Sequence, residues 1–126
     1  MYLSACIEWL FREEYPDFSD RVRAAKAQGF SHVEFHLWRD KPLAALAQAL
    51  EETGVRLSSF VVEPRRSLVD PAEHEQFLAA VSDSLAVSRQ LGSPPLVVAS
   101  GFSREGVAIA EQQAQAIHIL RQAATL

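Results

Sequence analysis

Residues 27–36 read AQGFSHVEFH, in which a glycine closes a helically spaced segment and alternating apolar and polar side chains follow at once. Gly29 is typical of the residue after a helix, and the alternation from His32 to His36 predicts a strand. Two further joints of this kind follow, with Gly54 before Arg56–Val62 and Gly92 before Leu96–Ala99. The recurring joint of helix, glycine and strand decides the fold.

Apolar residues at helical spacing fill the segments between these strands. The helices are predicted to run from Asp17 or Ser19 to Gln28, from Pro42 to Gly54, from Asp70-Pro71 to Gly92, and from beyond Gly106 to about Ala124. With Tyr2–Ile7 as the first strand, the chain reads as strand then helix four times over. Such alternation predicts a parallel sheet with right-handed crossovers.

The length of 126 residues is about half of the ~250 that a complete (β/α)8 barrel needs. No linker or change in composition divides residues 1–126, so we predict a single domain. The expected fold class is α/β, as a parallel (βα)4 half of a TIM barrel with its helices on one face. A fifth strand would be expected to follow Leu126, which suggests a truncated or partial chain.

The side chains of each predicted strand divide between two faces. One face is more apolar; its members are Leu3, Ala5, Ile7, Val33, Phe35, Leu37, Ser58, Phe60 and Val62. The other is smaller and more polar; its members are Ser4, Cys6, Glu8, His32, Glu34, His36, Ser59, Val61 and Glu63. This asymmetry favours a barrel wall over an open flavodoxin-like sheet, whose strands would be apolar on both faces.

Three glutamates with the same inward parity end consecutive strands: Glu8, Glu34 and Glu63. His36, two residues beyond Glu34, should point the same way. The carboxyl ends of barrel strands hold the active site, and this set could bind Mg²⁺ or Mn²⁺ or transfer protons. Each glutamate alone would equally suit a salt-bridged or solvated strand end, so both interpretations stay open.

Three further groups of loop residues have two possible roles each. Trp9, Phe11 and Trp38 could line a small-molecule pocket or pack beneath the loops. Arg65-Arg66 could hold a carboxylate or phosphate, although a solvated pair is favoured. Ser100-Gly101 resembles a backbone anion nest without the full glycine-rich signature.

Composition excludes several classes of function. The net charge of −4 gives no basic patch for nucleic acid or an anionic membrane. Cys6 is the only cysteine, which rules out an intramolecular disulfide, fits a buried small side chain and suggests a reducing cytoplasm. No apolar run approaches the ~20 residues of a membrane span. No Ser-His-Asp order, Walker motif or GxGxxG is present.

The chain resembles the N-terminal half of a hydroxypyruvate-isomerase-like protein of the xylose-isomerase-like sugar isomerase and epimerase superfamily. The matching stretches are Leu3–Leu10 (LSACIEWL), Ala27–Phe35 (AQGFSHVEF), Leu50–Leu57 (LEETGVRL) and Leu91–Ser100 (LGSPPLVVAS). Ala110–Leu126 looks like the helix before the fifth strand of that family. The order and spacing of these stretches carry the resemblance over essentially the whole chain.

The resemblance implies an enzyme that interconverts a small hydroxy-aldehyde and hydroxy-ketone with a divalent metal (Mg, Mn or Zn) and carboxylates. In that family the metal ligands and catalytic glutamates come mainly from strands five to eight, so no metal site is expected within this chain. The histidines that endonuclease-type relatives place after strands three and four are also missing here. The half present is expected to supply substrate contacts, namely Glu8, Trp9, Glu34, His36, Trp38, Glu63 and Ser100.

Two functions follow from this resemblance, and whether the chain is an enzyme depends on which holds. The first is a sugar or hydroxy-acid isomerase, with Glu34 and Glu8 as its best catalytic candidates. It would be completed by a second half-barrel from another copy, as a homodimer, or from another polypeptide. The second is a non-catalytic half-barrel module that binds a small molecule or a protein.

Overall fold

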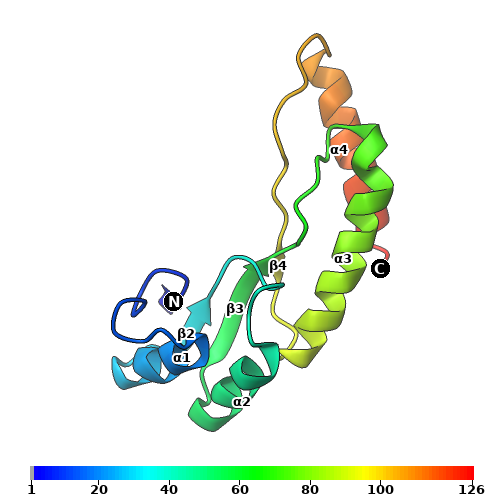
Figure 1. Ribbon diagram of the computed structural model, residues 1–126. Helices are drawn as coiled ribbons and strands as arrows, with labels where there is room; N and C mark the ends of the chain where they lie inside the picture. Colours follow the sequence, from blue (N-terminus) through cyan, green and yellow to red (C-terminus); the bar gives the residue numbers. More distant parts are fainter. Residues whose placement is uncertain (1) are drawn as a thin grey trace.

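The computed structural model describes residues 2–126 as one curved sheet with its helices alongside (Figure 1). The strands are β1 (Ser4–Cys6), β2 (His32–Glu34), β3 (Arg56–Val61) and β4 (Leu96–Val97). All are parallel, and their order in the sheet is β1-β2-β3-β4. This order confirms the barrel-type half sheet. It rules out the flavodoxin-like alternative, in which the strand order reverses at a switch point.

The strands are shorter than the alternation predicted, because the chain leaves the regular ladder early to enter the loops. The predicted bounds Tyr2–Ile7, His32–His36, Arg56–Val62 and Leu96–Ala99 are corrected accordingly. Single hydrogen bonds continue the pairing beyond the strands. The N–H of Ile7 donates to the carbonyl of Glu34 at 2.9 Å, and that of Val62 to Val97 at 2.9 Å.

The helices begin and end close to the predicted positions. They are α1 (Phe18–Ala27), α2 (Leu43–Thr53), α3 (His74–Gln90), preceded by the 3-10 turn η1 (Pro71–Glu73), and α4 (Ile109–Ala123). Asp17 caps α1, since its carboxylate accepts from the Ser19 N–H at 2.8 Å. Pro42 precedes α2 instead of opening it, because its ψ of 75° is not helical. No helix in the described part of the chain is long and apolar enough to span a membrane.

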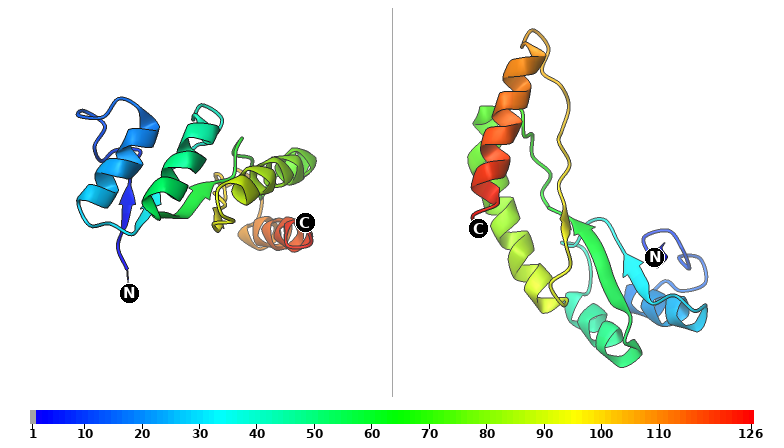
Figure 2. Two further views of the ribbon diagram at one scale, coloured as in Figure 1. Left: turned by 90° about the horizontal axis from the view of Figure 1, so that it is seen from below. Right: turned by 180° about the vertical axis from the view of Figure 1, so that it is seen from behind.

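The helices follow one another from α1 to α4 along the sheet (Figure 2). One core cluster joins β1, β2 and β3 to α1 and α2, around the fully buried Phe60, Val33 and Leu46. A second joins the end of β3 to α3 and α4, around Phe77 and Ile119. The polar face of the sheet, which the sequence predicted to carry the candidate site residues, is the face away from the helices.

A β-bulge breaks the alternation in β3. Val33 pairs with Leu57, but Glu34 pairs with Ser59, so Ser58 is an extra residue in the ladder. Its hydroxyl lies 2.7 Å from that of Ser4, on the polar face. The assignment of Ser58 to the apolar face was therefore wrong, because a bulge shifts the parity that simple alternation assumes.

Long extended connections leave β3 and β4 and run side by side (Figure 1). The N–H of Leu68 donates to the carbonyl of Ser100 at 3.2 Å and ties them together. Gly101 has a φ of +83°, and a Cβ placed there would lie 3.2 Å from the Cα of Ser67. Only glycine suits this close approach of the two loops.

Candidate functional site at the carboxyl ends of the strands

A hollow of about 450 Å³ lies over the carboxyl ends of the strands. It is lined by Glu8, Trp9, His36, Leu37, Asp40, Lys41, Val61, Arg65, Val97 and Ala99. These residues come from β3, β4 and the loops that follow all four strands. The sheet order thus brings together side chains that are far apart in sequence, at the end where barrels hold their active sites.

Glu8 uses both carboxylate oxygens within the protein. One accepts from the backbone N–H of His36 at 3.1 Å, and the other from the ammonium of Lys41 at 3.0 Å. Burial disfavours the charged form of Lys41, but the hydrogen bonds to Asp40 and Glu8 outweigh it and hold the pKa of Lys41 above its usual value. Glu8 therefore links the loop after β1 to the loop after β2.

Glu63 has a comparable internal role. Its carboxylate accepts from the backbone N–H groups of Trp38 at 2.8 Å and Arg39 at 2.9 Å. The indole of Trp38 is buried and donates to the hydroxyl of Ser84 at 3.1 Å. Of the two roles that the sequence left open for Trp38, the structure places it in packing beneath the loop.

Glu34 and His36 use fewer of their polar atoms within the protein than Glu8 and Glu63 do. Among residues 2–126, the Glu34 carboxylate makes no hydrogen bond or ion pair, and it is half-buried on the polar face. His36 is exposed, with its Nε2 3.7 Å from the Cys6 sulfur and its ring edge-on to Trp9 at 5.8 Å. Burial, aided by the negative charges of Glu34 and Glu8, raises the pKa of the Cys6 thiol. Cys6 is thus a neutral neighbour of these two groups.

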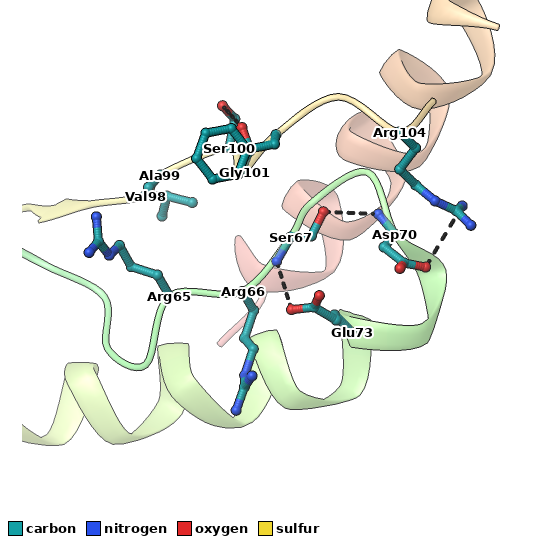
Figure 3. Close-up of a pocket in the computed structure, with 11 residues that line it drawn as sticks. Arg65, Arg66, Ser67, Asp70, Glu73, Val98, Ala99, Ser100, Gly101 and Arg104 are labelled. Atoms are coloured by element: carbon teal, nitrogen blue, oxygen red, sulfur yellow. Dashed lines mark hydrogen bonds and ion pairs between the residues drawn. The ribbon is translucent and has the colours of Figure 1, made fainter. Parts of the chain in front are cut away.

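A second, larger hollow of about 820 Å³ lies between the loops after β3 and β4 (Figure 3). Ser100 lines this hollow, so the structure separates it from the other residues that the sequence grouped with it. The acids here bind within the protein: Asp70 accepts from the Ala72 N–H and pairs with Arg104 at 3.7 Å, and Glu73 accepts from the Ser67 N–H. Arg65 and Ala99 line both hollows.

The described residues do not fit a divalent metal. No group of three or more His, Cys, Asp or Glu side chains among residues 2–126 is placed to hold one. The reason is local, since Glu8 and Glu63 already bind Lys41 and backbone N–H groups.

Sequence reasoning did not single out Lys41, which joins Glu8 to Asp40. Its position directly before Pro42, at the end of the loop that follows β2, was the available signal. Trp9, which was singled out, lies on the rim with 61% of its surface exposed.

Comparisons with known proteins agree with this architecture. A family model described as xylose isomerase-like TIM barrel matches residues 22–126. The chain belongs to this family. The predicted superfamily is thereby confirmed, and the sheet is the β1–β4 portion of a xylose isomerase-like barrel. A sequence search of curated proteins finds no match.

Three solved structures share the fold. AP endonuclease, family 2, from Brucella melitensis is 24% identical with a TM-score of 0.86, over 99% of this chain and 50% of its own. 3-Keto-D-glucoside 4-epimerase from E. coli is 17% identical with a TM-score of 0.77, over 99% and 52%. D-Allulose 3-epimerase from Methylomonas sp., in complex with D-allulose, is 18% identical with a TM-score of 0.62, over 85% and 40%. The chain spans about half the length, or less, of these proteins.

Proposed function

We propose that this xylose isomerase-like half-barrel belongs to a sugar or hydroxy-acid isomerase or epimerase of the hydroxypyruvate-isomerase type. One observation carries the proposal: a carboxylate without a partner among residues 2–126, that of Glu34, lies on the polar face of the sheet near the imidazole of His36, which contacts only the neutral Cys6 thiol through Nε2. The two residues leave β2 on the same side, at the end where barrel enzymes act.

The proposed chemistry is proton transfer next to a carbonyl. The Glu34 carboxylate removes the proton from the carbon beside the carbonyl and returns it to the neighbouring carbon, so no net proton is gained or lost. His36 passes a proton between the two substrate oxygens as the carbonyl and hydroxyl exchange places. Trp9 contributes an apolar wall beside His36.

We further propose that a second half-barrel completes the site, from another copy of the chain in a homodimer or from a partner polypeptide. The outer edges of β1 and β4 pair with no other strand in the described chain, and Tyr2, Leu3 and Val97 are exposed there. Unpaired edges favour strand pairing between chains. A Mg, Mn or Zn ion, if used, would take its ligands from that second half. A cytoplasmic location without nucleic-acid or membrane partners completes the proposal, supported by the single free Cys6 and the net charge of −4.

Hydroxypyruvate isomerisation by the assembled protein, assayed with added Mg²⁺, Mn²⁺ or Zn²⁺, tests the catalytic part. Glu34→Gln should abolish turnover, because an amide cannot accept the proton. Glu51→Gln, which removes a carboxylate from the exposed face of α2, is the matched control and should leave turnover unchanged. Sedimentation at micromolar concentration tests assembly, and a well-folded monomer that never dimerises would rule out the homodimer.

The alternative is a non-catalytic half-barrel module that binds a small molecule or a protein. It is favoured by the internal use of Glu8 and Glu63, two of the three glutamates at the strand ends. Saturable ligand binding without turnover, unchanged in Glu34→Gln, would favour this module over the enzyme.

A further inference from the structure

Arg65 occupies a central position between the two hollows. It follows β3, it is exposed, and it lines both the hollow that contains His36 and the one that contains Ser100. Figure 3 shows its side chain directed toward Val98 and Ala99 on the neighbouring loop. Its neighbour Arg66 points the opposite way, past α3, so only one of the two arginines faces the meeting point of the hollows.

Apart from Arg66, whose Nε is buried without a partner, the other charged side chains that line the two hollows are bound within the protein. In the first hollow, Glu8 and Asp40 both bind Lys41, at 3.0 and 2.9 Å. In the second, Asp70 pairs with Arg104, and Glu73 binds a backbone N–H group. Arg65 makes no hydrogen bond or ion pair with any of residues 2–126, although four carboxylates line the two hollows. A guanidinium left free in this way can take up an oxyanion from outside.

The surroundings of Arg65 suit a small molecule with one charged end. Val61, Val97 and Ala99 form an apolar floor, and the exposed ring of Trp9 forms a wall. His36 belongs to the same hollow, so a molecule whose oxyanion is held at Arg65 can present its other end to His36. The hydroxyl of Ser100 belongs to the larger hollow, which Arg65 also lines.

We infer that Arg65 is the anchor for a carboxylate or phosphate group of the substrate, and that the chain acts on anionic hydroxy-carbonyl compounds in preference to neutral sugars. This inference rests on the proposed isomerase function and adds the substrate class to it. Arg65 binds the non-reacting end and so determines specificity, while Glu34 and His36 act at the reacting carbons.

Binding to the purified chain tests the inference without any turnover. Three probes of the same carbon number are titrated at constant ionic strength: D-glycerate, sn-glycerol 3-phosphate and neutral glycerol. Trp9 fluorescence and calorimetry follow binding. We expect saturable binding of at least one anion and none of glycerol, and the stronger of the two anions identifies carboxylate or phosphate as the natural group.

Arg65→Gln should weaken that binding about tenfold or more, because it removes the charge-assisted hydrogen bonds. Arg65→Lys should give an intermediate loss, since lysine keeps the charge but not the planar fork. Arg89→Gln is the matched control: it removes one positive charge from an exposed position near the end of α3 and should change nothing.

Three results would overturn the inference: no saturable anion binding, an affinity that Arg65→Gln leaves unchanged, or an equal loss in Arg89→Gln. Failure of the proposed function is distinguishable. Anion binding that depends on Arg65, in an assembled protein that turns over neither hydroxypyruvate nor phosphorylated hydroxy-ketones, would refute the isomerase and leave an anion-binding module.

Discussion

The loops after β1 and β2 differ from those after β3 and β4 in how they use charge. In the first pair, the ammonium of Lys41 binds the carboxylates of Glu8 and Asp40. The carboxylate of Glu63 accepts a hydrogen bond from the backbone N–H of Trp38 in the second loop. In the second pair, residues 62–70 and 98–108 run long and extended, and Arg65 remains free. The charged groups of the first two loops are therefore held within the protein, whereas the guanidinium of Arg65 is available to the ligand that we propose. Changes to the first two loops should affect stability, and changes to the long loops should affect binding.

The largest expected effect comes from comparing a phenylalanine in the core beneath the loops with one in the loop after β4. Phe60 is fully buried and stacks on Phe35 at 5.4 Å, so Phe60→Ala should cost about 3–5 kcal/mol, a large part of the stability of a typical domain. Phe102, 94% exposed in the loop after β4, is the matched control. Phe102→Ala should leave the urea midpoint unchanged, and similar shifts in the two variants would show that the long loop contributes as much to stability as the core does.

A buried hydroxyl gives the next largest effect. Ser84 accepts from the Trp38 indole at 3.1 Å and from the Glu63 N–H at 3.3 Å. Ser84→Ala leaves both donors buried without that partner and should cost about 1–3 kcal/mol, with a change in tryptophan emission. Ser82→Ala, on the exposed face of α3, should cost almost nothing. Equal stability of the two variants would show that Trp38 does not depend on this contact.

Glu8→Gln should have a smaller effect, about 1 kcal/mol, because Lys41 keeps Asp40 as a partner. The pKa of Lys41 is raised in the folded protein, so its stabilising contribution is complete below its unfolded value of 10.5 and is lost as the pH rises through the folded value. Thermal melts from pH 8 to 11 should show less alkaline destabilisation in Glu8→Gln. Glu14→Gln, at an exposed position, should follow the wild type. Identical dependence of the melting temperature on pH in all three proteins would show that the Glu8–Lys41 ion pair does not contribute to stability.

The smallest effect is expected at the cap of α1. Hydrogen bonds from Ser19 hold the pKa of Asp17 below its usual 3.8, so its contribution is present above that value and is lost as the pH falls through the folded value. Asp17→Asn should flatten this acid dependence in melts between pH 2 and 5, since an amide can cap the helix without titrating. Glu13→Gln, exposed in the same loop, should not. If the melting temperature of Asp17→Asn fell with acid as much as that of the wild type, the titrating group would not be Asp17.

The order of elements and the family could be predicted from sequence, because both depend on local signals. Gly29 and Gly54 mark where helices end, and the alternation around Val33 reveals a wall with one polar face. The parity rule failed at Ser58. A bulge depends on the pairing of two strands, and one strand read alone does not contain that information.

The position of the three glutamates at the ends of consecutive strands could also be predicted, but their partners could not. Glu8 meets Lys41 across 33 positions of sequence, and Glu63 reaches the N–H of Trp38 across 25. Such contacts depend on how the loops fold back over the strand ends. For the same reason, Arg65-Arg66 read as one solvated pair, whereas the two side chains point in opposite directions (Figure 3).

The close approach of Gly101 to Ser67 has a practical consequence for protein engineering. A side chain at position 101 would meet both an unfavourable backbone angle and a neighbouring backbone atom 3.2 Å away. A mutant library that includes this position would consist mainly of clones that distort the larger hollow. Phe102, next in the chain and almost fully exposed, tolerates variation. A library that randomises Phe102 while keeping Gly101 fixed would therefore vary the lining of the larger hollow without distorting its backbone.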